Sequence, residues 1–184
     1  MSLKLVPPQV LPPLDEDFRP AILANQNFQR EVESVGVRIV IGVERSGGEV
    51  SRFETKVYPE GHPNFESNVP GLFIAGELGG MGLIRKAAEQ GRQAMDSIAR
   101  MKTGIADHDV VIIGCGPAGI SAGLGAIEKQ LRYVLIEQEE SLGGAIFHYP
   151  RNKVAMTAPV NLPLVGKMKF SEVSKEKLLE FWQD

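Results

Sequence analysis

The feature that most constrains this chain is a turn in which three glycines follow a short apolar stretch. Residues 110–113 read VVII and residues 114–119 read GCGPAG. This G-x-G-x-x-G spacing, between a predicted strand and a predicted helix, is typical of a β-α-β unit that binds a dinucleotide. Gly114 permits the tight turn, Gly116 lets the backbone approach a pyrophosphate, and Gly119 lets helix and strand pack closely.

The residues that open the predicted helix favour an anionic ligand. Pro117 suits the first helical turn, where its missing N–H has no intrahelical partner to lose, and Ala118 follows it. Backbone N–H groups at a helix start, together with the helix dipole, attract negative charge. We therefore expect this turn to bind a pyrophosphate through Gly114, Gly116, Pro117, Ala118 and Gly119.

An acidic residue stands where a ribose-binding carboxylate is expected. Glu137 follows the next predicted strand and lies 23 positions after Gly114 (137 − 114). A carboxylate about 20 residues after the glycines accepts hydrogen bonds from adenosine ribose hydroxyls. It would repel a 2′-phosphate, which favours FAD or NAD over NADP. The alternative interpretation is a glycine-rich turn that binds nothing, followed by a surface glutamate.

The order of apolar stretches predicts an α/β fold. Strands are predicted at 72–75, 110–113 and 133–136, and helices at 83–100, 117–130 and 175–182. Alternating strands and helices of this kind form a parallel sheet covered by helices. The fold class we expect is a Rossmann-like FAD/NAD(P)-binding fold with a small N-terminal β-hairpin region.

The first third of the chain is predicted to be organised differently. A strand at 37–41 and a second at 50–57 are expected to form a hairpin, followed by a proline-containing loop at 59–70. We therefore divide the chain into an N-terminal arm and hairpin region, residues 1–65, and a Rossmann-like domain expected to bind FAD or NAD, residues 66–184.

Composition and charge exclude several classes of function. Hydrophobic residues make up 43% of the chain, enough for a packed core, and a net charge of −3 argues against a nucleic-acid partner.

Cys115 is the single cysteine, which excludes an intrachain disulfide and is typical of a cytoplasmic protein. Glycines interrupt the uncharged stretch 110–127, so a membrane span is not expected. The histidines lack metal-ligand spacing, so no metal site is expected; they are His62, His108 and His148.

Taken with its flanks, the glycine turn resembles the pyridine nucleotide–disulfide oxidoreductase superfamily, especially its thioredoxin reductase-like and bacillithiol disulfide reductase-like members. Residues 141–144 read SLGG and match the turn that passes near the cofactor in that superfamily, which implicates Gly144. Residues 149–157 are similar to the loop beside the isoalloxazine ring in the bacillithiol reductase-like proteins. Within that loop, Lys153 is either close to the flavin or a solvated lysine.

A second segment carries the same resemblance. Residues 69–77 read VPGLFIAGE and look like the superfamily's late FAD motif. In that motif an acid binds the ribityl chain or the phosphates of FAD, and Glu77 occupies the matching position. The resemblance implies that Gly76, Glu77 and Gly80 contact the ribityl–phosphate region.

The resemblance implies an FAD-binding component of a flavin-dependent oxidoreductase that transfers electrons between NAD(P)H and an acceptor, with FAD as cofactor and NAD as the alternative. Additional NAD(P)-binding and electron-transfer domains or subunits would be its partners, and a homo-oligomer is also expected. No catalytic residue is assigned. The alternatives are a non-catalytic FAD- or NAD-binding module and a junction fragment that binds nothing.

This chain departs from the superfamily pattern in three ways. Its two FAD motifs occur in reversed order, which indicates either a junction of a tandem protein, the origin we favour, or a circular permutant. In both cases we expect the motifs to share one sheet. Cys115 stands alone, so dithiol–disulfide exchange is excluded. The second G-x-G-x-x-G unit is absent, residues 1–65 being at most a remnant of it, so hydride transfer from NAD(P)H by this chain alone is not expected.

Overall fold

The computed structural model describes residues 38–41, 55–57, 63–67, 70–76, 83–101, 105–137, 141–168 and 172–183. Its main strands are β1 (Arg38–Ile41), β2 (Thr55–Val57), β3 (Pro63–Ser67), β4 (Leu72–Ile74), β5 (Val110–Ile113) and β6 (Tyr133–Ile136). Its α-helices are α3 (Ile84–Ile98), α4 (Pro117–Glu128) and α5 (Lys175–Gln183). The remaining elements are the 3-10 helix η3 (Gly144–His148) and the short strands β7 (Val154–Met156), β8 (Asn161–Leu162), β9 (Gly166–Lys167) and β10 (Val173–Ser174).

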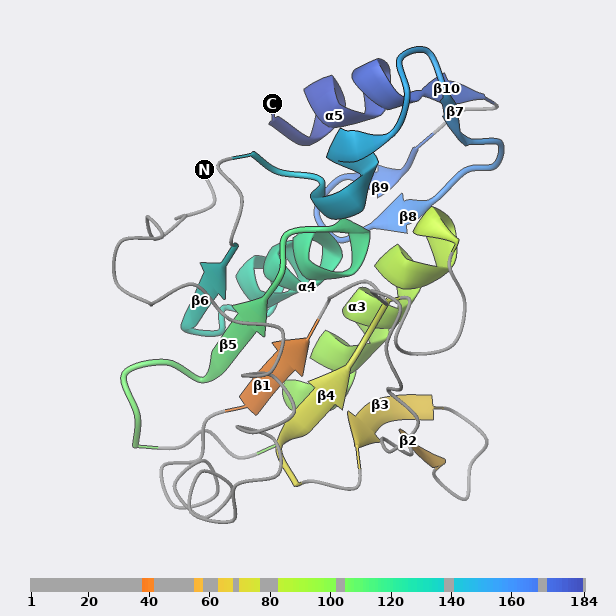
Figure 1. The fold of residues 1–184 in the computed structure, drawn as a ribbon. Coiled ribbons are helices and arrows are strands. Elements are labelled where there is room, and N and C mark those ends of the chain that lie inside the picture. The colour runs from red at the N-terminus through yellow and green to blue at the C-terminus, as the bar shows by residue number, and fades with distance from the viewer. Residues whose placement is uncertain are drawn as a thin grey trace, which may run out of the picture.

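A six-stranded sheet forms the centre of the molecule, in the order β2-β3-β4-β1-β5-β6. β4, β1, β5 and β6 run parallel, whereas β2 and β3 are antiparallel additions at one edge. Figure 1 shows β1, in orange, between the yellow β4 and the green β5. The prediction of an α/β fold with a parallel sheet is confirmed, and both motif-bearing strands, β4 and β5, belong to the same sheet.

The four parallel strands end in one row. Ile41 pairs with Ile74 on one side and with Ile113 on the other, and Ile113 pairs with Ile136. Because the carboxyl ends of parallel strands meet at the same edge, the residues that follow β4, β5 and β6 emerge at one edge of the sheet, with β1 between β4 and β5. In open α/β sheets this edge is where ligands bind.

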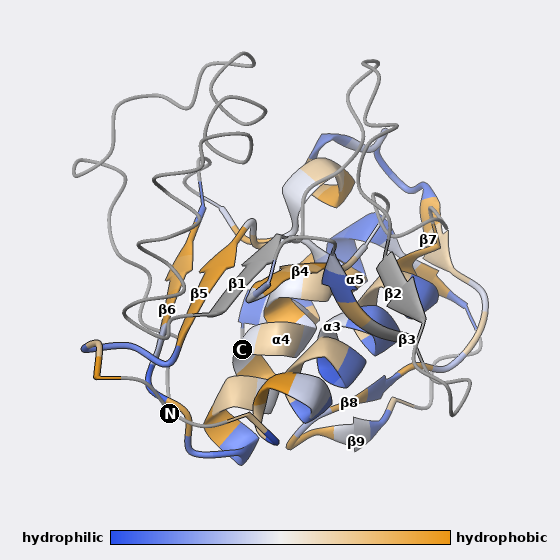
Figure 2. Cartoon of the chain, turned by 90° about the horizontal axis from the view of Figure 1, so that it is seen from below, coloured by the Kyte–Doolittle hydropathy of each residue, from blue (hydrophilic) through white to orange (hydrophobic). Residues whose placement is uncertain are grey.

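Two helices cover the same face of this sheet. α3 follows β4 and α4 follows β5, and their backbones approach so closely that a Cβ on Gly91 would stand 2.1 Å from the carbonyl oxygen of Ala118. Figure 2 shows α4 in mostly pale and orange colours, whereas α3 mixes blue and orange along its length. The buried side of α3 packs with the sheet into the main core, which includes Phe73, Met95 and Ile112. The amphipathic pattern of the α3 sequence predicted this arrangement.

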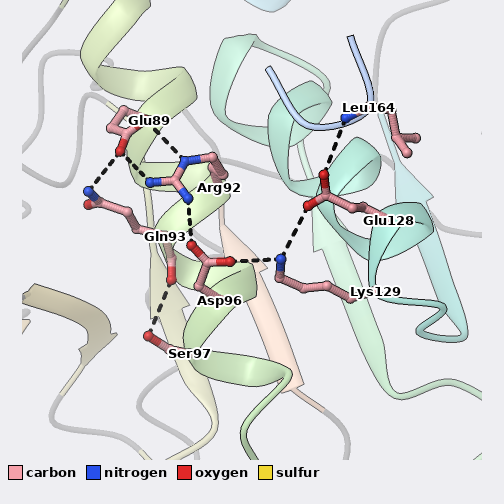
Figure 3. Close-up of polar contacts among 8 residues, drawn as sticks. All are labelled: Glu89, Arg92, Gln93, Asp96, Ser97, Glu128, Lys129 and Leu164. Carbon is pink, nitrogen blue, oxygen red and sulfur yellow. Dashed lines mark hydrogen bonds and ion pairs between the residues drawn. The ribbon is translucent and has the colours of Figure 1, made fainter. Parts of the chain in front are cut away.

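A cluster of ion pairs joins the outer sides of α3 and α4 (Figure 3). Arg92 contacts Glu89 at 2.6 Å and Asp96 at 2.7 Å, both on α3. Lys129, just after α4, contacts the other oxygen of Asp96 at 2.7 Å. Asp96 therefore links the two helices.

The C-terminal part of the chain packs on the same helices. A second core cluster joins Ile146, Met156 and Leu178 to Ala88 of α3. The predicted terminal helix is present as α5, and the Ser174 Oγ, just before it, accepts a hydrogen bond from the backbone N–H of Lys177 at 3.5 Å. The strands β7 to β10 were not expected, because two or three residues are too few to show a period.

The N-terminal hairpin prediction is wrong in its pairing. β2 pairs with β3, which lies within the loop expected at 59–70, and β1 pairs with β4 and β5 instead of β2. The six-stranded sheet therefore crosses the predicted division at residue 65. Hairpin turn chemistry is a local signal, and it gave no information about the more distant partners that β1 has. Among the described helices, none has both the length and the apolar character that crossing a membrane requires.

Candidate dinucleotide-binding site

The turn after β5 has a backbone that requires glycine at two positions. Gly114 has φ +92°, in the left-handed region that favours glycine, and its N–H donates to the carbonyl oxygen of Ile136 at 2.8 Å. A Cβ on Gly119 would stand 1.8 Å from the carbonyl oxygen of Gly114. The close packing of α4 on β5 predicted from the sequence is therefore present.

The start of α4 carries no side-chain cap. Gly116 is the N-cap residue, makes no side-chain capping bond, and precedes Pro117 at the first helical position. The first amides of a helix have no intrahelical acceptor, so a helix start of this kind presents donors and a positive dipole end. Ala118 is 1% exposed and belongs to the main core, and its backbone carbonyl faces Gly91 of α3.

Glu137 lies against the middle of this turn. It follows β6, is 8% exposed, and its Oε2 accepts a short hydrogen bond from the backbone N–H of Cys115. A buried carboxylate is costly unless it is hydrogen-bonded, and this bond helps to hold it at the site. The structure thus places the acidic residue beside the glycine turn, and its contact with a ribose stays a prediction.

The SLGG segment forms another side of the site. The N–H of Gly143 donates to the carbonyl oxygen of Cys115 at 2.9 Å. A Cβ on Gly144, which has φ +54°, would stand 3.1 Å from the Cα of Gly116. A side chain at this left-handed position would crowd the Gly116 backbone, so glycine suits it, and the segment expected near the cofactor lies against the glycine turn.

Of the late-motif residues, Gly76 is described, and Glu77 and Gly80 fall outside the described residues. Gly76 follows β4, is buried, and has φ +94°. Its N–H donates to the side-chain Oε1 of Gln90 on α3 at 2.8 Å. Gln90 could not be recognised from the sequence, because nothing in the helix sequence distinguishes this glutamine until the strand order is known.

Cys115 is fully buried in the turn. Burial, with the negative charge of Glu137 nearby, raises the pKa of its thiol to about 12. The thiol is therefore neutral at physiological pH, as expected for a packing residue.

Two lysines lie over aromatic rings in and beside the loop at 149–157. Lys153, which is exposed, has its Nζ 3.9 Å from the centre of the Tyr149 ring. The Lys175 Nζ donates to the carbonyl oxygen of Tyr149 at 2.7 Å and lies 5.7 Å from the centre of the Phe147 ring. His148 packs edge-on against Phe147, with the ring centres 5.6 Å apart.

Comparison with protein families bears on the same part of the chain. Residues 109–160, which span β5, the glycine turn, α4, β6, Glu137 and the SLGG segment, match the model of one family. The comparisons with curated proteins and with solved structures found no match. The matched family is described as FAD dependent oxidoreductase, and the match supports an FAD-dependent oxidoreductase relationship for this segment.

Proposed function

We propose that this chain is the FAD-binding component of a flavin-dependent oxidoreductase of the pyridine nucleotide–disulfide type, with a Rossmann-like fold. The observation that carries the proposal is the placement of the buried Glu137 carboxylate against the amide of Cys115, inside the G-x-G-x-x-G turn. A carboxylate next to bare glycine backbone can serve one dinucleotide, because the backbone N–H groups suit a pyrophosphate and the carboxylate suits ribose hydroxyls.

The residues present fit FAD. The amides at Gly116 and the uncapped start of α4 would hold the pyrophosphate, and Glu137 would accept hydrogen bonds from the adenosine ribose. The loop after Gly76, with Glu77 and Gly80, would hold the ribityl–phosphate region. When bound, the flavin supplies the electron-transfer chemistry, and the chain supplies binding and orientation.

Electron exchange with NAD(P)H would require further domains or subunits. The sequence contains a single G-x-G-x-x-G turn, which the FAD would occupy. We therefore propose that an additional NAD(P)-binding unit and an acceptor unit complete the electron path.

The test is the absorbance spectrum and ligand content of the purified chain, before and after incubation with FAD. We expect a yellow protein that releases FAD on denaturation, or a colourless one that takes up about one FAD per chain. A colourless chain that takes up NAD and no FAD would identify a different nucleotide-binding module. A chain that binds neither would contradict the proposal.

A further inference from the structure

Two adjacent residues of α3 contact both segments of the proposed FAD site. The Oε1 of Gln90 accepts a hydrogen bond from the N–H of Gly76, 2.8 Å away and 14 positions earlier in the chain. A Cβ on the next residue, Gly91, would stand 2.1 Å from the carbonyl oxygen of Ala118, in the first turn of α4. Two neighbouring residues of α3 thus contact Gly76, just after β4, and the start of α4, just after the glycine turn.

The contact between α3 and α4 is well defined in both position and rotation. Beyond the Gly91–Ala118 contact, a Cβ on Gly125 would stand 3.1 Å from the Cβ of Met95, and Lys129 reaches Asp96 at 2.7 Å. These contacts follow one another along the two helices. Because interiors packed this tightly do not deform freely, the position of Gln90 relative to the glycine turn is fixed.

The backbone N–H of Gly76 finds its hydrogen-bond acceptor outside the sheet, on α3. The last residue of β4 is Ile74, so Gly76 is already beyond the strand, and its φ of +94° turns the chain away from the strand direction. Its N–H is satisfied by the Gln90 side chain. An amide acceptor has no net charge, so it holds Gly76 without adding electrostatic repulsion toward a diphosphate.

We propose that Gln90 is a positioning residue that sets the backbone of Gly76 at a fixed place relative to the glycine turn, so that Gly76 and the glycine turn border the same FAD molecule. This inference rests on the proposed function. Gln90 acts through Gly76 and does not itself contact the cofactor. Gly91 completes the link by allowing the close approach to Ala118.

The test compares Gln90→Leu with Gln93→Leu in the full chain. Gln93 lies on the same helix and bonds Glu89 at 2.9 Å, and that contact is away from both segments. We expect Gln90→Leu to weaken FAD binding about fivefold to tenfold, the loss of one buried hydrogen bond, and Gln93→Leu to change it less than about twofold. Flavin fluorescence quenching measures the affinity, and the visible circular dichroism of bound flavin reports its orientation.

Hydrogen exchange at the Gly76 amide, measured without FAD, tests the bond separately. We expect faster exchange in Gln90→Leu, and restored protection in Gln90→Glu, whose carboxylate still accepts from this amide. Unchanged exchange and unchanged affinity in Gln90→Leu would overturn the inference, as would an equal effect of Gln93→Leu. If the unmodified chain bound no FAD, the proposed function would fail first, whatever the exchange data showed about the bond.

Discussion

The carboxylate of Glu137 accepts a hydrogen bond from the backbone N–H of Cys115, although 22 positions separate these residues in the chain. This bond joins the end of β6 to the turn that leaves β5. The bond uses one carboxylate oxygen, Oε2, and a glutamine at this position would keep an oxygen that can accept it. Removing the charge therefore tests ligand binding with little change to the fold.

Glu137→Gln should bind FAD about 5 to 30 times more weakly, because charged hydrogen bonds to ribose hydroxyls would become neutral ones. The glutamine carbonyl can still accept from Cys115, so the melting temperature without FAD should change little. Calorimetric titration with FAD measures the effect. Glu128→Gln, on the exposed side of α4, is the control and should bind as the unmodified chain does. Equal affinity in both variants would remove Glu137 from the site.

Gly119→Ala should destabilise the chain by about 3 kcal/mol, since its Cβ would stand 1.8 Å from a backbone oxygen that cannot move independently. Gly125→Ala, in the same helix, is the matched control because its Cβ would meet Met95 at 3.1 Å. There the gain in helix propensity, about 1 kcal/mol, offsets most of the crowding. Urea unfolding measures both, and equal losses would contradict the close packing at Gly119.

Asp109 and Arg132 should make the fold sensitive to acid. Arg132 donates to both carboxylate oxygens, at 2.6 Å and 3.0 Å, and these bonds hold the pKa of Asp109 below its ordinary value. The stabilisation is present at neutral pH and is lost as the pH falls below about 4, where the unfolded chain takes up the proton first.

Asp109→Asn should therefore lower the free energy of unfolding at pH 7 by about 1–2 kcal/mol. The unfolding free energy of this variant should also decrease less steeply as the pH falls. Unfolding free energies at several pH values provide the measurement. Asp107→Asn, at an exposed position nearby, should leave both the stability and its pH dependence nearly unchanged.

The pair of Asp96 and Lys129 should contribute little, despite its 2.7 Å separation in Figure 3. Both side chains are partly solvated, and pairs of this kind are worth about 0.2–1 kcal/mol. A double-mutant cycle with Asp96→Asn and Lys129→Met measures the coupling, which should decrease in 0.5–1 M salt. A salt-independent coupling above about 2 kcal/mol would contradict the partial solvation of the two side chains.

Cys115 should not react with thiol reagents in the folded chain. Its side chain is fully buried, and a thiol pKa near 12 leaves almost no thiolate at pH 8. Ellman's reagent should label one thiol per chain in denaturant and almost none without it. Fast labelling of the folded chain would contradict the burial. Cys115→Ala should retain FAD binding.

The parts that could be predicted from the sequence depend on local signals. The strand–turn–helix around Gly114 was placed correctly because glycine spacing, an apolar stretch and Pro117 all act within a few residues. The proximity of Glu137 to the turn followed from the length of a single β-α-β unit. The place of β1 and the role of β3 could not be predicted, since both depend on pairing between distant segments. Gln90 was missed for the same reason.

The position of β1 has a consequence for any ligand held by both motifs. β4 and β5 carry these motifs, and β1 lies between them, so two strand spacings, about 9–10 Å, separate the ends of the two strands. Residues 38–41, which were assigned to a different region, therefore set how long a molecule must be to span from one motif to the other. A chain without this strand would bring the motifs to a different separation even if every glycine and Glu137 were kept.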